Sequence, residues 1–130
     1  MSRSWIMGLA TALVATAAVA AEELRAGGQT GTASFYGAEL AGRPTASGVP
    51  YDPTALTAAH ATLPFGSEVT VIALATGRRV KVEVNDRGPF TADRVIDLSR
   101  RAAELLGIVT RGVARVRIIP SVREPRPPAR

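Results

Sequence analysis

The sequence predicts a mainly β protein, a small β-barrel with one short helix. Several short segments alternate apolar and polar residues, which is the period of a half-buried strand. Only one segment carries helix signals at both of its ends. Long connections rich in Gly, Pro and Thr separate these segments, and short strands with long connections favour a barrel over a sandwich. We place the folded part at residues 31–120, a single modest domain.

Four segments are predicted as strands because apolar and polar residues alternate along them: 32–36, 69–74, 79–85 and 114–118. The second and third form a hairpin, with Gly77 supplying the positive φ of a tight turn. In the third strand, Val80, Val82 and Val84 fall on one face. The last strand is expected to stop at Pro120.

One helix is predicted over residues 100–106. Ser99 is a favourable N-cap residue, and Gly107 stands where a helix commonly ends. The residues expected to face the core are Leu98, Ala102, Leu105 and Leu106. The stretch 38–67 has little periodicity, and a compact domain seldom contains so long a loop without a function for it.

The first twenty residues resemble a secretory signal peptide. Arg3 gives the positive start, residues 6–19 are apolar or small, and 18–20 (AVA) match the small-x-small cleavage pattern. The apolar run is shorter than the ~20 residues that cross a bilayer, so cleavage is favoured over a retained anchor. We therefore expect an exported protein.

The remaining ends are predicted to be unstructured, and the composition narrows the chemistry. Residues 21–30 form a flexible lead, and 121–130 a disordered Arg/Pro tail. No cysteine is present, which excludes disulfides, thiolate metal sites and a lipid-modified cysteine anchor. The net charge is +5, carried almost wholly by arginine because Lys81 is the sole lysine. Outside the cytoplasm we expect a monomer that associates weakly with anionic envelope surfaces, not nucleic acid; a basic surface without a partner is the alternative.

Asp86 is the first candidate for chemistry. Counting by twos from Val80 places it on the valine face at the end of its strand. A partly desolvated carboxyl there would suit a general acid, although pairing with Arg87 would oppose that shift. The alternative is an aspartate that accepts backbone N–H bonds in the turn before Gly88. Spacing alone does not separate the two.

The other candidates have strong structural alternatives. His60 is the single histidine, and a lone histidine is more often a hydrogen-bonded structural residue than a catalyst. With one histidine and no cysteine, a metal site is not expected. Asp52 has the context of an ordinary turn aspartate. Arg94 and Asp97 flank an apolar pair, and Asp97 could help to cap the following helix.

Seven segments, in this order, closely resemble the rare lipoprotein A (RlpA) family. The resemblance covers residues 31–120, and seven motifs in series are far more specific than any one. The segments are 31–37 (GTASFYG), 42–48 (GRPTASG), 51–52 (YD), 56–60 (LTAAH), 62–66 (TLPFG), 85–90 (NDRGPF) and 94–99 (RVIDLS).

The resemblance implies a six-stranded double-psi β-barrel with one or two short helices. It also implies a peptidoglycan lytic transglycosylase without a cofactor, which acts on glycan strands poor in stem peptides. In that reaction an acid protonates the glycosidic oxygen, and the 6-hydroxyl of muramic acid closes onto C1 to leave a 1,6-anhydro end. One carboxyl can serve as acid and then base.

Motif matching carries three catalytic residues over to this chain. Asp86 is implied as the acid/base, Asp52 as an electrostatic or positioning partner, and His60 as an orienting hydrogen-bond group. The substrate-binding residues implied are Arg87, Tyr36, Tyr51 and Asn85.

The sequence departs from the family pattern in three places. Val49 stands where many active relatives carry a glutamate, and Glu39 is the nearest substitute. A valine cannot transfer a proton, so a non-catalytic peptidoglycan-binding or expansin-like wall-loosening module is the alternative function. The lipid-attachment cysteine is missing, and only the Arg/Pro tail follows the domain.

Overall fold

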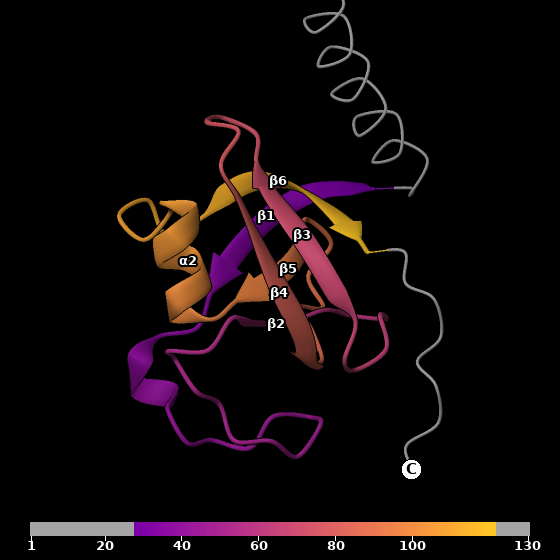
Figure 1. Cartoon of the computed structure of the whole chain (residues 1–130), viewed down its shortest axis with the longest axis vertical. Coiled ribbons are helices and arrows are strands. Elements are labelled where there is room, and N and C mark those ends of the chain that lie inside the picture. Colours follow the sequence, from indigo (N-terminus) through magenta and orange to yellow (C-terminus); the bar gives the residue numbers. More distant parts are fainter. Residues whose placement is uncertain (1–27, 122–130) are drawn as a thin grey trace, which may run out of the picture.

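A computed structural model describes residues 28–121 as six strands that close a barrel (Figure 1). The predicted signal peptide, most of the predicted lead and nearly all of the predicted tail lie outside the described residues. Within these residues, a 3₁₀ turn η1 (Ala38–Leu40) and one helix, α2 (Arg100–Leu106), accompany the barrel. The strands are β1 (Gln29–Phe35), β2 (Thr57–Ala59), β3 (Glu68–Ala73), β4 (Arg79–Asp86), β5 (Arg94–Leu98) and β6 (Ala114–Pro120).

The strand order around the barrel is β1-β5-β2-β4-β3-β6. β1 and β5 are parallel, as are β2 and β4, whereas all other neighbouring pairs are antiparallel. If β1 is exchanged with β4, β2 with β5 and β3 with β6, the same cyclic order of strands results, read in the opposite direction. The barrel therefore has internal pseudo-symmetry. The predicted mainly β, six-stranded barrel is confirmed.

The inner faces of the strands form one apolar core. Val80, Val82 and Val84 point inward, as their alternation predicts, and each is no more than 7% exposed. Burying such a side chain stabilises the fold by ~1.5–3 kcal/mol. Other fully buried members of the cluster include Val69, Val71, Ile96, Leu98, Val116 and Ile118. In the part of the chain that the structure describes, no helix is long and apolar enough to cross a bilayer.

Helix α2 has the predicted ends but not quite the predicted buried face. The Ser99 hydroxyl accepts a hydrogen bond from the Ala102 N–H, and Gly107 ends the helix at φ +81°. Leu105 is 41% exposed, while Ala103 is buried in its place. At 3.6 residues per turn, Leu105 lies ~110° from the centre of the buried stripe, so its predicted burial is wrong.

Strands β2 and β5 and the first residue of β1 differ from the sequence-based prediction. β1 begins at Gln29, and Gln29 and Thr30 pair with β6, so the barrel includes the last residues of the predicted flexible lead. β2 and β5 have no counterpart among the four predicted strands. β2 spans only three residues, too few to show alternation. In β5, a break in the register with β1 obscures the alternation of apolar and polar residues.

A bulge at the end of β4 places Asp86 on the opposite face from the prediction. Ala58 pairs with Val84, but Ala59 pairs with Asp86, so Asn85 is the extra residue. Because neighbours in β2 point to opposite faces, Asp86 shares the outer face with Ala59 while Val84 faces the core. Counting by twos fails here since one residue is inserted into the ladder.

Candidate active site

Three adjacent strands place two carboxylates on the same outer face of the barrel. Ala59 of β2 pairs with Asp86 of β4 on one side and with Asp97 of β5 on the other. Directly paired residues share a face, so Ala59 forms a small, flat floor between the two acids. Because β2 lies between β4 and β5, two interstrand spacings separate the Cα atoms of Asp86 and Asp97, which is roughly 10 Å.

A long arm, residues 41–51, folds over the Asp86 side of this floor and is drawn in purple below the barrel in Figure 1. The Tyr51 N–H donates to the Arg43 carbonyl at 2.7 Å, and a bridge joins Pro44 to Pro50. The arm is fixed to β4 where the Ser47 N–H donates to the Asn85 carbonyl. Part of the predicted functional loop is therefore an ordered cover over Asp86.

Three donors hold the Asp86 carboxylate. Oδ1 accepts from the N–H groups of Ala46 and Arg87, both at 2.8 Å, and Oδ2 accepts from the Tyr36 hydroxyl at 2.6 Å. Burial raises the pKa of Tyr36, and the hydrogen bond to Asp86 raises it further. Tyr36 therefore remains a hydroxyl donor at any physiological pH. Oδ1 is saturated by backbone groups, and Oδ2 keeps acceptor capacity.

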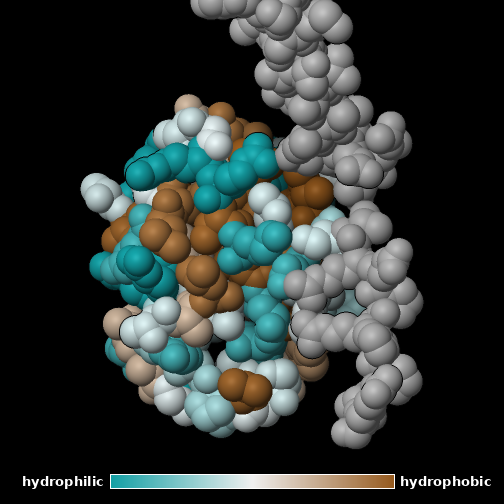
Figure 2. Space-filling view, viewed as in Figure 1, coloured by the Kyte–Doolittle hydropathy of each residue, from teal (hydrophilic) through white to brown (hydrophobic). Residues whose placement is uncertain are grey.

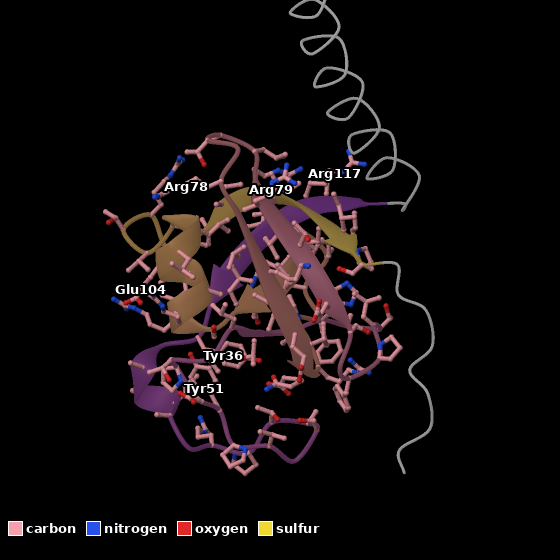
Figure 3. All side chains as sticks on the ribbon, viewed as in Figure 1. Tyr36, Tyr51, Arg78, Arg79, Glu104 and Arg117 are labelled. Carbon is pink, nitrogen blue, oxygen red and sulfur yellow. The ribbon has the colours of Figure 1, made fainter. Side chains whose placement is uncertain are left out.

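A cavity of about 210 Å³ lies between Asp86 and the arm. The Tyr36 and Tyr51 rings stand edge-on to each other, 5.1 Å apart, and Figure 3 shows them together below the barrel. Tyr51 is 4% exposed and its hydroxyl accepts from the Arg100 N–H, which ties the arm to the start of α2. Burial raises the pKa of Tyr51. The cavity walls include Tyr36, Leu40, Arg43, Thr45, Tyr51 and Asp86.

Asp52 is not part of the cavity wall. Its carboxylate accepts from the N–H and hydroxyl of Thr54, at 2.9 and 2.7 Å, in a local turn. These two bonds lower the pKa of the exposed Asp52 carboxyl. The structure thus shows the turn geometry, and the positioning role remains a prediction.

His60 lies at the end of β2 with its ring buried. Nδ1 accepts from the Thr62 and Leu63 N–H groups, both at 3.1 Å, so the ring proton is on Nε2, 3.2 Å from the Gln29 side-chain oxygen. Burial lowers the pKa of His60, and the charge of Arg87 lowers it further. The imidazole therefore holds a loop together and does not contribute to the cavity wall.

Arg87 and Asn85 are not part of the cavity wall either. The Arg87 guanidinium donates to the carbonyls of His60 (3.2 Å) and Leu63 (2.7 Å), and lies 4.1 Å from the centre of the Phe65 ring. Asn85 is the bulged residue, and its carbonyl anchors the arm. Of the seven predicted site residues, the cavity thus brings together Tyr36, Tyr51 and Asp86.

Two further groups face this region and are not among the seven predicted site residues, although Asp97 is one of the candidates considered from the sequence. Asp97 accepts from Ser34 and forms an ion pair with Arg94, so its predicted capping alternative is wrong. Residues three apart on a strand normally face opposite sides, but a bulge at Val95 turns Arg94 and Asp97 to the same face. Arg43 lines the cavity, and its place in the 42–48 motif is the sequence signal for it. The signal for Asp97 is its pairing across Ala59, which requires the topology.

Within residues 28–121, no group of three or more His, Cys, Asp or Glu side chains lies close enough to hold a metal ion. The groups present at the site are two carboxylates, hydroxyls and guanidinium groups.

A family model described as "Lytic transglycolase", for the double-psi β-barrel, matches residues 28–118. The chain belongs to this family. The resemblance expected from the seven motifs and the double-psi fold class are thereby confirmed.

Curated relatives are similar over about two thirds of this chain. A protein of Nostoc sp. named "Probable endolytic peptidoglycan transglycosylase RlpA" is 58% identical over 68% of this chain and 24% of its own length. The endolytic peptidoglycan transglycosylase RlpA of Neisseria meningitidis serogroup A is 52% identical, over 69% of this chain and 38% of its own length. The chain thus spans well under half the length of these curated relatives.

Solved structures share the fold. A Streptomyces papain inhibitor superposes with a TM-score of 0.57 and 27% identity, over 71% of this chain and 92% of its own. An expansin of Clavibacter michiganensis superposes with a TM-score of 0.60 and 21% identity, over 78% of this chain and 53% of its own. At that identity the expansin likeness supports the fold alone.

Proposed function

We propose that this protein cleaves peptidoglycan glycan strands as a lytic transglycosylase. The observation that carries the proposal is Asp86, whose carboxylate is held by three donors beside a cavity on the outer face of the barrel. Family membership and relatives named as endolytic peptidoglycan transglycosylases support the same substrate. The Oδ2 oxygen of Asp86, which keeps acceptor capacity beside the Tyr36 bond, is the proposed proton carrier.

The proposed reaction uses one carboxyl group twice, first as an acid and then as a base. Protonated Asp86 gives its proton to the glycosidic oxygen, and the bond from C1 to that oxygen breaks. The muramic 6-hydroxyl then bonds to C1 and returns its proton to Asp86, so no water is consumed. The Tyr36 hydroxyl fixes Oδ2 by its 2.6 Å bond and orients it through both steps.

Charged groups around the floor complement this chemistry. The Asp97 carboxylate, across Ala59, is placed to stabilise positive charge that develops at C1. Arg94 and Ser34 hold that carboxylate in position. Arg43 at the cavity wall is exposed and suits the lactyl carboxylate of a muramic residue.

Asp52 and His60 act at a distance in this proposal. Asp52 follows Tyr51 directly, and its turn with Thr54 sets the path by which the arm leaves the cavity. His60 closes the loop whose carbonyls hold Arg87, the residue after Asp86. Both are therefore positioning residues for Asp86 and Tyr51.

The proposed substrate and the predicted leader point to one compartment. Peptidoglycan lies in the cell envelope, and residues 1–20 match a signal peptide. We propose that the protein acts in the periplasm as a monomer, without a lipid anchor at a cysteine, on strands poor in stem peptides.

The direct test uses amidase-stripped glycan strands in ¹⁸O-labelled water with residues 21–130. A transglycosylase yields 1,6-anhydromuramic ends without ¹⁸O, seen by mass spectrometry. Reducing ends that contain ¹⁸O would instead show a hydrolase. Strands that stay intact while the protein co-sediments with them would show a binding module.

The binding module is the second candidate function, and Val49 favours it. This side chain is 55% exposed on the arm, where its carbonyl accepts from Thr45, and it offers no group for proton transfer. Glu39 is exposed on η1 and is not part of the cavity wall, so it does not replace a carboxyl there. If the wild type binds without cleaving and Val49→Glu cleaves, the chain is a binding module that lost its acid. If the wild type cleaves and Val49→Glu adds little, Asp86 is sufficient.

A further inference from the structure

Basic residues gather on one part of the barrel that carries no acidic residue of its own. Residues 69–82 and 105–121 contain no Asp or Glu. These segments lie side by side, because β3 pairs with both β4 and β6. The basic residues within them are Arg78, Arg79, Lys81, Arg111, Arg115 and Arg117.

Two loop tips meet at the barrel end away from the candidate active site. The Leu74 N–H at the end of β3 donates to the Arg115 carbonyl of β6 at 3.0 Å. A cavity of about 140 Å³ lies between the β3–β4 turn and the segment after α2, and it shares no residue with the Asp86 cavity. In Figure 1 the β3–β4 turn lies at the top of the barrel and the arm at the bottom.

Apolar and guanidinium groups alternate on this end. Leu74 is 50% exposed and Val113 is 49% exposed, one on each loop tip. Arg111 and Arg115 line the cavity between the tips. Arg78 lies against Gly107 at the end of α2, and Figure 3 shows it on the β3–β4 turn. We call Leu74, Arg78, Arg111, Val113 and Arg115 the far-end surface.

Charge on the far-end surface is little compensated. Within the described residues, the one ion pair of these five side chains joins Arg115 to the exposed Asp93 at 3.5 Å, a distance typical of weak surface pairs. At the upper end of the molecule in Figure 2, hydrophilic and hydrophobic groups lie side by side. Half-exposed aliphatic side chains among arginines match a headgroup layer, where the cations meet phosphates and the aliphatic tips enter the acyl boundary.

We infer that the far-end surface docks the protein on an anionic phospholipid membrane. A soluble polyanion would use the arginines but would give Leu74 and Val113 no apolar environment. When the protein docks in this way, the arm and Asp86 at the opposite end of the barrel face away from the bilayer. The inference does not depend on the glycan chemistry of that end.

The test measures partition of residues 21–130 into vesicles of phosphatidylglycerol and phosphatidylcholine against phosphatidylcholine alone, at 150 mM salt. Arg78→Gln with Arg111→Gln should weaken binding to the anionic vesicles by roughly 10- to 30-fold, since each arginine near such a surface contributes roughly fivefold. The double variant Leu74→Ser with Val113→Ser should also weaken binding to the anionic vesicles. The matched controls are Arg100→Gln with Arg101→Gln on α2, which removes the same charge, and Leu56→Ser; both should bind like the parent.

Inorganic polyphosphate separates a lipid site from a simple cation surface. The serine pair should bind polyphosphate as the parent does while it loses vesicle affinity. Equal vesicle binding by the parent and the serine pair would overturn the inference and show an ion-exchange surface. Equal losses in the control arginine pair would overturn it by showing that net charge alone is responsible. Circular dichroism melts confirm that each variant is folded.

Discussion

At the residue scale, the sequence points to Asp86 but not to its environment. The NDRGPF segment marks it, yet its face is set by the bulge at Asn85, and two of its three donors, Tyr36 and Ala46, lie forty or more residues away. Asp86 accepts backbone N–H bonds, as the structural alternative predicts. It also borders a cavity, and its general-acid role stays a prediction.

Tyr36→Phe tests whether the phenol orients Asp86. Removing a donor to a charged acceptor forfeits ~1.5–3 kcal/mol, so we expect glycan cleavage to slow roughly 10- to 100-fold. Affinity for the strands, measured by co-sedimentation, should remain near that of the parent. An unchanged cleavage rate would show that the Tyr36 hydroxyl has no part in the reaction.

The buried His60 predicts acid sensitivity of the fold. Its folded-state pKa lies below the ordinary value of 6.5, so the unfolded chain takes up the proton first. Stability should therefore fall as the pH drops below about 6.5 and should level off above it. Urea unfolding between pH 5 and pH 8 measures the slope.

His60→Asn supplies the matched control. An asparagine oxygen can accept from the Thr62 and Leu63 N–H groups but does not titrate, so the extra loss of stability between pH 6.5 and pH 5 should disappear. If the parent and the variant lose stability in parallel, His60 is not the group responsible.

At the element scale, regular pieces are predictable and the pieces that position the site are not. The β3–β4 hairpin and helix α2 have local signals, such as the valine alternation and the Ser99 and Gly107 caps, and these predictions are confirmed. The short β2, the bulges at Asn85 and Val95 and the ordered arm depend on partners distant in sequence. Local periodicity carries no information about such pairings.

Ser99→Ala tests the connection between α2 and the arm region. The hydroxyl accepts from the Ala102 N–H and donates to the Ala55 carbonyl at 2.6 Å, so its loss should cost ~1–3 kcal/mol of unfolding free energy. Chemical denaturation provides the value. Thr110→Ala, at an exposed position, should change it by less than ~0.5 kcal/mol, and an equal effect of the two would contradict this account.

At the scale of the whole molecule, the barrel is one cooperative unit. Its core cluster draws on β1 through β6 and α2, all within residues 28–121. A fragment of residues 28–121 should therefore unfold in one transition, with a denaturant midpoint equal to that of residues 21–130. A lower midpoint, or a second transition, would show that the flanking segments contribute to the fold.

Cleavage by the Asp86→Asn variant tests the central claim most directly. Asparagine preserves the shape but cannot transfer the proton, so the rate of 1,6-anhydromuramic end formation should fall by ~10²–10⁴. Co-sedimentation with glycan strands should persist, and Asp52→Asn should keep most of the parent rate because Asp52 lies outside the cavity wall. If Asp86→Asn cleaves like the parent while Asp97→Asn does not, the proton carrier lies across Ala59 and the assignment of Asp86 is contradicted.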